Sequence, residues 1–194
     1  MDFFKKLFNI SNKEDSEIQK QEVKLSLDDL FVHKFVEKGG KFLYCIKKEE
    51  IKSNLNNVLL ENNWSTLHLL NKNLKEYLTP KDLKIAEKFS KETPIFTVCE
   101  HLIAENGDIM FSSNQLGSTK LVDFPENFIV FATTSQIVKD TGQGLTGIKT
   151  NCKGPLPTNI SSIRNYQIHK NDDNFLNYGN SNSKNLYLLL LEDL

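Results

Sequence analysis

Polar side chains that could bind a small molecule are concentrated between residues 105 and 120. They are Glu105, Ser112, Ser113, Asn114 and Lys120. The carboxylate, hydroxyl and amide groups can position the hydroxyl or amide groups of a ligand, and the lysine can meet a carboxylate or a phosphate. This composition predicts a ligand site. The alternative is that Glu105 and Lys120 are solvated loop charges and that Gly107 only permits a turn.

Two short apolar runs frame these polar residues. Residues 109–111 and 128–131 are apolar and are bounded by Gly, Pro, Asn and Asp. Such runs are typical of buried strands that end at loops. Because ligands bind at the loops of open α/β sheets, the predicted site requires a sheet whose loops meet at one edge.

A glycine-rich motif occurs further along the chain. Gly142, Gly144 and Gly147 match G-x-G-x-x-G, the dinucleotide fingerprint that directly follows a strand and opens a helix. Here the helix-like residues 135–140 precede the glycines, and no acidic residue stands about 20 residues later in a second-strand position. The sequence therefore favours a glycine-weakened helix end or a loop over a nicotinamide or flavin site.

Other catalytic templates do not match the sequence. It has no G-x-S-x-G elbow, no Walker loop and no HExxH. The histidines are dispersed: His33, His68, His101 and His169. Glu100 and His101 could serve as an acid/base pair, but neighbours in a helix point to different faces, which disfavours joint action.

The cysteines indicate neither disulfide bonds nor a metal site. Cys45, Cys99 and Cys152 are odd in number and widely spaced, with no CxxC pair. This pattern argues against a disulfide framework and against a zinc or iron–sulfur cradle. Reduced thiols in a cytoplasmic protein are the simplest interpretation.

The composition indicates one ordinary globular domain. Lys+Arg number 24 and Asp+Glu 25 in a chain of 194 residues, so no basic footprint for nucleic acid is present. No apolar stretch is long enough for a signal peptide or a membrane span. We therefore expect a cytoplasmic chain with a single α/β domain at residues 25–194.

The first 24 residues differ from the rest. Residues 2–10 place apolar side chains on one helical face with lysines opposite. Such a face could dock on a membrane surface or a partner, but one short helix more often packs on its own domain or on a sister subunit, which leaves a homo-oligomer open. Residues 11–24 are polar without apolar periodicity and predict a flexible linker.

From residue 25 the apolar spacing predicts alternating helices and strands. Strands are expected at 41–46, 64–70, 93–99, 109–111, 127–133, 156–164 and 185–191. Helices are expected at 25–38, 48–62, 100–104 and 135–140. A further helix is expected to begin at Thr79-Pro80, with Asp82 in its first turn. Residues 71–78 are expected to be helical or irregular. The strand-helix-strand order predicts a sheet covered by helices.

Four short motifs follow one another along the chain. They are Glu105-x-Gly107, Lys120-Leu121-x-x-Phe124-Pro125-x-x-Phe128-Ile129, Ser135-Gln136-Ile137-Val138 and Leu156-Pro157-Thr158-Asn159-Ile160-Ser161. Their order and spacing resemble those of the LUD domain of lactate-utilisation proteins, a family typified by the C subunit of the lactate-utilisation operon. The resemblance covers residues 27–194.

The resemblance implies a fold and a metabolic role. It implies a three-layer α/β/α sandwich of the NagB/RpiA/CoA-transferase-like kind with a mostly parallel sheet. It also implies a link to the oxidation of L-lactate to pyruvate beside iron–sulfur subunits, with no cofactor in this chain. The family's pocket residues carry over to Glu105 and Gly107 and to Lys120 and Pro125. A small organic acid or a phosphate-bearing molecule is the implied ligand.

A third part of the family pocket does not carry over. The family's Gly-Pro-Ser-Arg-Thr-Ala-Asp segment is replaced at residues 165–173, and its Gly-Val-His-Gly-Pro turn is replaced at residues 178–182. These changes remove glycine, serine and arginine groups suited to an anion. Two functions follow: a ligand-binding component of lactate or related carboxylate metabolism, or a non-catalytic relative that serves as a ligand sensor or assembly scaffold.

Overall fold

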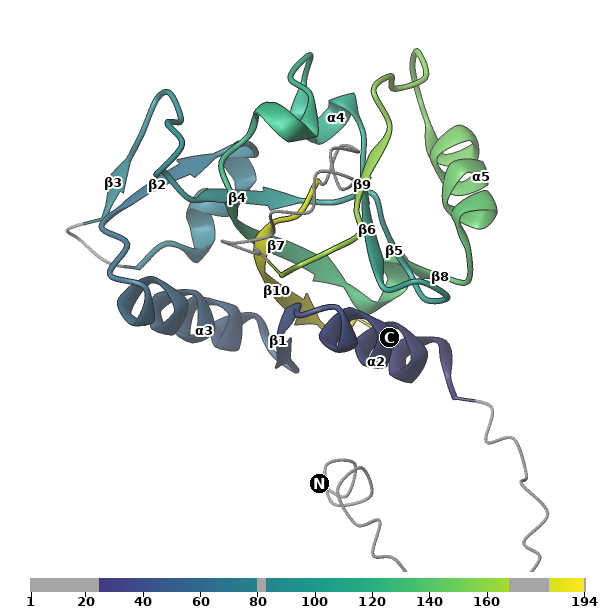
Figure 1. Ribbon diagram of the computed structural model, residues 1–194, viewed down its shortest axis with the longest axis horizontal. Helices are drawn as coiled ribbons and strands as arrows, with labels where there is room; N and C mark the ends of the chain where they lie inside the picture. Colours follow the sequence, from purple (N-terminus) through teal and green to yellow (C-terminus); the bar gives the residue numbers. More distant parts are fainter. Residues whose placement is uncertain (1–24, 80–82, 168–181, 194) are drawn as a thin grey trace, which may run out of the picture.

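A six-stranded parallel sheet forms the centre of the protein. The computed structural model describes residues 25–79, 83–167 and 182–193 (Figure 1). The strand order is β1-β10-β7-β4-β2-β3, and each neighbouring pair is parallel. The strands are β1 (Lys41–Cys45), β2 (Thr66–Leu69), β3 (Lys84–Ile85), β4 (Ile95–Val98), β7 (Asn127–Thr133) and β10 (Asn185–Leu191).

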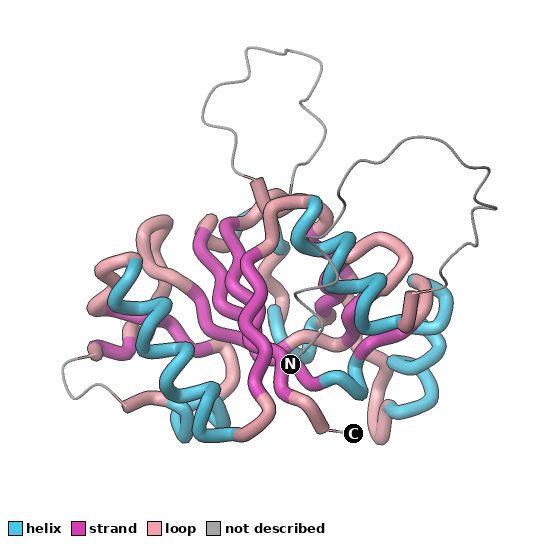
Figure 2. The backbone as a smooth tube through the Cα atoms, turned by 90° about the horizontal axis from the view of Figure 1, so that it is seen from below, coloured by secondary structure: helices cyan, strands magenta, loops and turns pink. Residues whose placement is uncertain are grey.

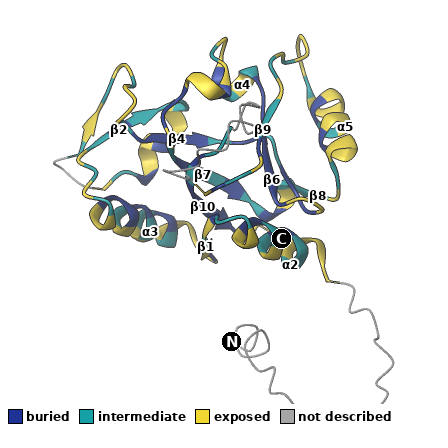
Figure 3. Ribbon diagram, viewed as in Figure 1, coloured by how far each residue is buried: buried dark blue, intermediate teal, exposed yellow. Residues whose placement is uncertain are grey.

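Strands β7 and β10 occupy the middle of this sheet. They pair in register from Asn185 opposite Asn127 to Leu191 opposite Thr133, and both are buried along most of their length (Figure 3). A parallel strand that is covered on both faces needs apolar side chains at successive positions. This requirement explains the unbroken run of leucines at residues 188–191.

Helices cover one face of the central sheet. These are α3 (Lys48–Glu61) and the 3-10 helix η1 (Lys72–Tyr77), and Figure 2 shows the strands between helices on either side. The buried residues of α3 are Ile51, Leu55, Val58 and Leu59. This spacing forms one apolar stripe, which packs with Phe96, Ile129 and Leu189 of the sheet.

The opposite face is covered by one helix and a second, smaller sheet. The helix is α2 (Leu27–Glu37), and the small sheet has the order β8-β5-β6-β9. Its strands are β5 (His101–Ile103), β6 (Asp108–Phe111), β8 (Ile137–Val138) and β9 (Ser161–Ile163). Phe31 and Phe35 of α2 join the small sheet and the central sheet in one buried cluster.

Helix α5 (Thr141–Asn151) lies on the outer side of the small sheet. Its Ile148 packs against Ile103 and Met110. Three short elements connect the larger ones: α4 (Ser113–Leu116), η2 (Leu121–Asp123) and η3 (Thr134–Gln136). The expected α/β class, with a mostly parallel sheet flanked by helices, is confirmed. No helix in the described part of the chain has the length and apolar character that a membrane span requires.

Most expected elements of the central sheet are present, but the helix predicted at residues 100–104 is wrong. These residues enter β5, which pairs antiparallel with β6 so that His101 lies opposite Met110. Leu102 and Ile103 are both fully buried, one in the cluster against the central sheet and the other beneath α5. A strand can bury successive side chains on opposite faces, which a helix with one apolar stripe does not do.

The helix predicted at residues 135–140 is also wrong. The chain makes the single turn η3 and then the short strand β8, and α5 begins only at Thr141. The side chain of Gln136 folds back to accept a hydrogen bond from the Thr133 N–H at 2.9 Å. This bond closes a tight turn, after which Ile137 and Val138 pair with β5.

The helix expected after Thr79-Pro80 is not found from residue 83 onward. Residues 84 and 85 instead form β3, with the Lys84 N–H donating to the Ser65 carbonyl and the Ala86 N–H donating to the Leu67 carbonyl. Pairing at the open edge of β2 overrides the local helix propensity. Pro80 and Asp82 lie outside the described residues, as do the segment at 1–24 and the parts of the altered segments at 168–173 and 178–181.

Candidate functional site

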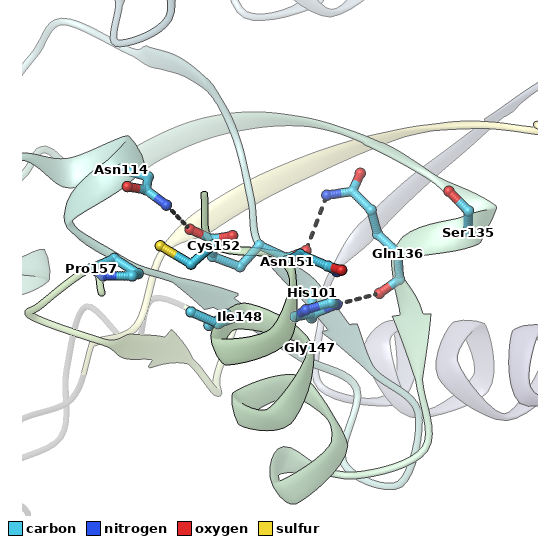
Figure 4. Close-up of a pocket in the computed structure, with 10 residues that line it drawn as sticks. His101, Asn114, Ser135, Gln136, Gly147, Ile148, Asn151, Cys152 and Pro157 are labelled. Carbon is cyan, nitrogen blue, oxygen red and sulfur yellow. Dashed lines mark hydrogen bonds between the residues drawn. The ribbon is translucent and has the colours of Figure 1, made fainter. Parts of the chain in front are cut away.

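A polar pocket of about 320 Å³ lies at the carboxyl ends of β4 and β7 (Figure 4). It is lined by Glu100, His101, Asn114, Ser135, Gln136, Gly147, Ile148, Asn151, Cys152 and Pro157. Strands β4 and β7 are parallel neighbours, so the segments that follow them leave the same edge of the sheet. This is the edge at which open α/β sheets bind ligands.

The carboxylate of Glu100 is held in place by a turn from another part of the chain. Its Oε1 accepts hydrogen bonds from Ser112 Oγ at 2.5 Å, Asn114 Nδ2 at 2.9 Å and Gln115 Nε2 at 3.0 Å. Ser112 is fully buried and caps α4. Because all three donors meet Oε1, the orientation of the carboxylate is fixed and Oε2 keeps its acceptor capacity.

The hydrogen bond of His101 defines its neutral tautomer. Nδ1 donates to the carbonyl oxygen of Gln136 at 3.3 Å, and a carbonyl oxygen can only accept. In the neutral ring Nε2 therefore carries the lone pair. Figure 4 shows His101 beside Gly147 of α5 and joined to Gln136. A Cβ at Gly147 would lie 2.7 Å from Nε2, so the glycine makes room for the imidazole.

The side chain of Gln136 ties the two strand ends together. Its Nε2 donates to the carbonyl oxygens of Cys99 at 2.7 Å and Glu100 at 3.2 Å. The segment after β7 is thus bonded to the segment after β4. This bridge sets the position of Glu100 and His101 relative to η3.

The rim of the pocket is tied to the carboxyl end of β10 by Asp193. Its Oδ1 accepts from Thr134 Oγ1 and the Ser135 N–H, both at 2.8 Å, and its Oδ2 accepts from Ser135 Oγ at 2.7 Å. Desolvation raises the pKa of Asp193, but the hydrogen bonds from Ser135 and Thr134 outweigh it and lower the pKa to about 2. The carboxylate therefore holds Ser135 at the rim.

Acid titration should expose the contribution of Asp193. A carboxyl group whose pKa is lower in the folded state than in the unfolded state stabilises the folded protein at pH values above its unfolded pKa, which is about 3.9 for Asp. This stabilisation is lost as the pH falls from about 4 to 2. We expect Asp193→Asn to lower stability at pH 6 by less than about 1 kcal/mol, because the group is exposed. Urea unfolding at pH 6 and pH 3 should show a smaller difference between variant and wild type at pH 3. An equal difference at both values would contradict the assignment.

The glycine-rich motif serves the packing of α5. Gly142, Gly144 and Gly147 all lie within this helix, and a Cβ at Gly144 would lie 3.2 Å from Ile103 and from Met110. The helix is preceded by the short strand β8, not by the expected helix. Its N-terminus is capped by the Asp140 carboxylate, which accepts from the Gln143 N–H at 2.8 Å. A negative side chain stands where a pyrophosphate would need to bind.

The three thiols lie in separate environments. Cys45 packs in the cluster under α3, and Cys99 packs in the cluster on the other face of the central sheet. Burial raises the pKa of both thiols. Cys152 lines the pocket and donates to the carbonyl oxygens of Gly154 and Pro155 at 3.2 Å. Within the described residues, no group of three His, Cys, Asp or Glu side chains could hold a metal ion.

Comparison with known proteins identifies the family. A family model described as the LUD domain matches residues 29–191, most of the chain. The chain belongs to the LUD domain family. The crystal structure of a DUF162 family protein from Deinococcus radiodurans has the same fold, with a TM-score of 0.59 and 12% sequence identity over 87% of this chain and 99% of that one. No curated protein matches this LUD domain significantly.

Only part of the predicted site lies at the pocket of this LUD domain. Ser112 supports Glu100, and Asn114 lines the pocket. Ser113 is one residue away and binds the backbone of Thr158 through its N–H and its hydroxyl oxygen. These residues link α4 to the loop before β9.

The remaining predicted residues of the LUD domain lie elsewhere. Glu105 and Gly107 are in the turn at the other end of the β5–β6 hairpin, where Glu105 is exposed and 3.9 Å from Lys139 Nζ. Lys120 is exposed before η2, and Pro125 is buried between η2 and β7. Ligand binding by these residues stays a prediction. The sequence had offered Glu100 and His101 only as an improbable pair, because it placed them in a helix.

Proposed function

We propose that this LUD domain binds L-lactate or a related small organic acid in the pocket after β4 and β7, as a component that acts beside iron–sulfur redox subunits. The observation that carries the proposal is that Glu100 and His101 line one pocket at the carboxyl edge of the sheet, together with polar residues of α4 and α5. A volume of about 320 Å³ is at the small end of ligand pockets.

The pocket has the groups that a hydroxy acid needs. Glu100 Oε2 and His101 Nε2 can accept a hydrogen bond from a hydroxyl group. The amides of Asn114 and Asn151 lie at the pocket and can donate to a carboxylate oxygen. Such an arrangement is suited to a small polar molecule.

In this proposed function, partner subunits accept the electrons from oxidation of the organic acid. Cys45 and Cys99 lie in clusters on opposite faces of the central sheet, so these two thiols do not share one site. Family membership, through the link between LUD domains and lactate oxidation, supports an iron–sulfur protein as the partner. In this arrangement the LUD domain would hold the organic acid.

Thermal unfolding in the presence of candidate ligands tests the proposal. L-lactate, D-lactate, L-malate and inorganic phosphate would each be titrated against the full chain. A ligand at about 100 times its dissociation constant stabilises the folded state by about 2.7 kcal/mol. We expect L-lactate or a related hydroxy acid to raise the unfolding temperature of the wild type.

Variants locate the binding site. Asn151→Phe places a large side chain at an exposed lining position and should abolish the stabilisation without changing the unfolding temperature of the free protein. Glu105→Ala and Lys120→Ala test the separate site predicted from the sequence, and a loss of stabilisation in either variant would place the ligand there. Stabilisation that survives Asn151→Phe would place the ligand elsewhere. If no ligand acts, the assembly-scaffold function is favoured.

A further inference from the structure

Glu100 and His101 each present a hydrogen-bond acceptor to the pocket. Within the described part of the chain, the three hydrogen bonds to the Glu100 carboxylate all fall on Oε1 and leave Oε2 available, and in the neutral form of His101 Nε2 carries a lone pair because Nδ1 donates to Gln136. Among the described lining residues, none is lysine or arginine. The Gln136 amide nitrogen already donates to the carbonyl oxygens of Cys99 and Glu100, so at Glu100 and His101 the wall offers a ligand acceptors and no cation.

The end of α5 adds to this electronegative character. Ile148, Asn151 and Cys152 line the pocket and belong to the last turn and C-cap of α5, and Gly147 directly precedes this turn. The last carbonyl groups of a helix lack partners within the helix, and the helix dipole places partial negative charge there. The Cys152 thiol does not offset this charge, because it already donates to the carbonyl oxygens of Gly154 and Pro155.

We infer that the pocket selects ligands by a hydroxyl or ammonium donor that binds between Glu100 Oε2 and His101 Nε2, and that it rejects the corresponding carbonyl compound. The inference rests on the proposed function only in taking this pocket as the ligand site. A hydroxyl group can donate a hydrogen bond to these acceptors. A keto oxygen can only accept, so its lone pairs would face those of the Glu100 carboxylate. An unpaired polar contact of this kind strongly disfavours binding.

Glu100→Gln should reverse the selection. The three donors require an acceptor at the Oε1 position, and only the amide oxygen of glutamine can supply it. The amide NH2 group must then occupy the Oε2 position and point its donors at the ligand. Because the network around Ser112, Asn114 and Gln115 is retained, the variant should fold as the wild type does.

His101→Asn removes the second acceptor alone. The Asn side-chain nitrogen can reach the position of Nδ1 and keep the bond to Gln136, but no atom replaces Nε2. His68→Asn is the matched control, because His68 Nδ1 also bonds a backbone carbonyl, that of Ala86 at 2.8 Å, outside the pocket. For Glu100→Gln the control is Glu50→Gln, whose carboxylate accepts backbone bonds from Ile46 and Lys47.

The test compares matched ligands by isothermal titration calorimetry. The pairs are L-lactate with pyruvate and the uncharged L-lactamide with pyruvamide, and L-alanine supplies an ammonium group at the same carbon. We expect the wild type to bind the alcohol or amine at least tenfold more tightly than the carbonyl compound, since a charged hydrogen bond is worth about 1.5–3 kcal/mol. Glu100→Gln should lose this preference or favour the carbonyl, and His101→Asn should weaken alcohol binding. Both controls should match the wild type.

The outcomes separate the inference from the proposed function. Binding of L-lactamide or L-alanine without L-lactate would support the donor rule and refute an organic acid as the ligand. Equal or tighter binding of the carbonyl compounds by the wild type would overturn the rule even if lactate binds. An unchanged preference in Glu100→Gln, with the fold intact by circular dichroism, would also overturn it, as would the absence of binding by every alcohol and amine at millimolar concentration.

Discussion

Gly107→Ala is expected to lower the free energy of unfolding by about 3 kcal/mol or more. Gly107 lies in the β5–β6 turn with φ +66°, a conformation that costs a residue with a Cβ about 1–2 kcal/mol. A Cβ at this position would lie 2.5 Å from the Phe35 nitrogen and 2.6 Å from the Lys34 carbonyl carbon. Both atoms belong to the backbone of α2, so no side chain can rotate away, and overpacking adds about 1–3 kcal/mol.

The same turn is bonded to the far end of the small sheet. Tyr166 Oη donates to the Gly107 carbonyl at 2.6 Å, and its ring packs edge-on against Phe35 at a centroid distance of 4.5 Å. A shift of the turn would therefore disturb α2 and the segment after β9 together. We therefore predict that Gly107 is required for the stability of the fold, whichever ligand the domain binds.

Urea unfolding of Gly107→Ala and Gly117→Ala would measure this effect. Gly117 also has a positive φ, +59°, but a Cβ there would meet nothing within 4 Å. Its replacement should cost only the backbone contribution, about 1–3 kcal/mol. The difference between the two variants isolates the clash with α2. Equal destabilisation would show that α2 moves aside without cost.

The sequence was sufficient for five of the six strands of the central sheet, all except β3, because each of these five carries its own signal. The apolar runs in β7 and β10 are long and bounded by polar residues, and the stripe in α3 has a helical period. In the small sheet, β6 and β9 fall at predicted strands, but β5 and β8 contain only three and two residues and were predicted as parts of helices. Their pairing depends on partners distant along the chain.

The candidate site was missed for a related reason. Glu100 looked like one charged residue in a short helix, but its carboxylate is set by donors twelve to fifteen positions later. His101 owes its tautomer to a carbonyl 35 positions away. Spacing along the chain favoured Glu105, which the hairpin carries to the opposite end from Ser112. Recognition of this pocket required the pairing of β5 with β6, which the sequence does not encode locally.

Lys184 should give the protein a rise in stability between about pH 8 and pH 10. Lys184 is only 4% exposed, and its Nζ donates to the Phe124 carbonyl at 2.8 Å and lies 5.6 Å from the centroid of the Phe128 ring. Desolvation by burial lowers the pKa of Lys184 to about 8, against the opposing effect of Glu126 and Asp123. At neutral pH the buried ammonium charge therefore lowers the free energy of unfolding.

The sign of the pH dependence follows from proton binding. Between the folded pKa of about 8 and an unfolded value of about 10.4, the unfolded chain binds more protons than the folded chain. Stability therefore increases with pH across this window. At about 1.4 kcal/mol per pKa unit, the contribution from this one lysine is of the order of 3 kcal/mol.

Lys184→Met isolates this contribution from the other lysines and the tyrosines that titrate at high pH. Methionine has a similar length and no charge, so the difference in unfolding free energy between wild type and variant should increase in favour of the wild type from pH 7.5 to pH 10.5. Lys149→Met, at an exposed position of α5, should show a constant difference over the same range. If the Lys184→Met difference is also constant, the ammonium group is solvated in the folded protein and the bond to Phe124 does not hold it inside. A rising difference would instead show that the segment entering β10 folds around a buried ammonium group. The run of leucines that follows gives no sign of such a group in the sequence.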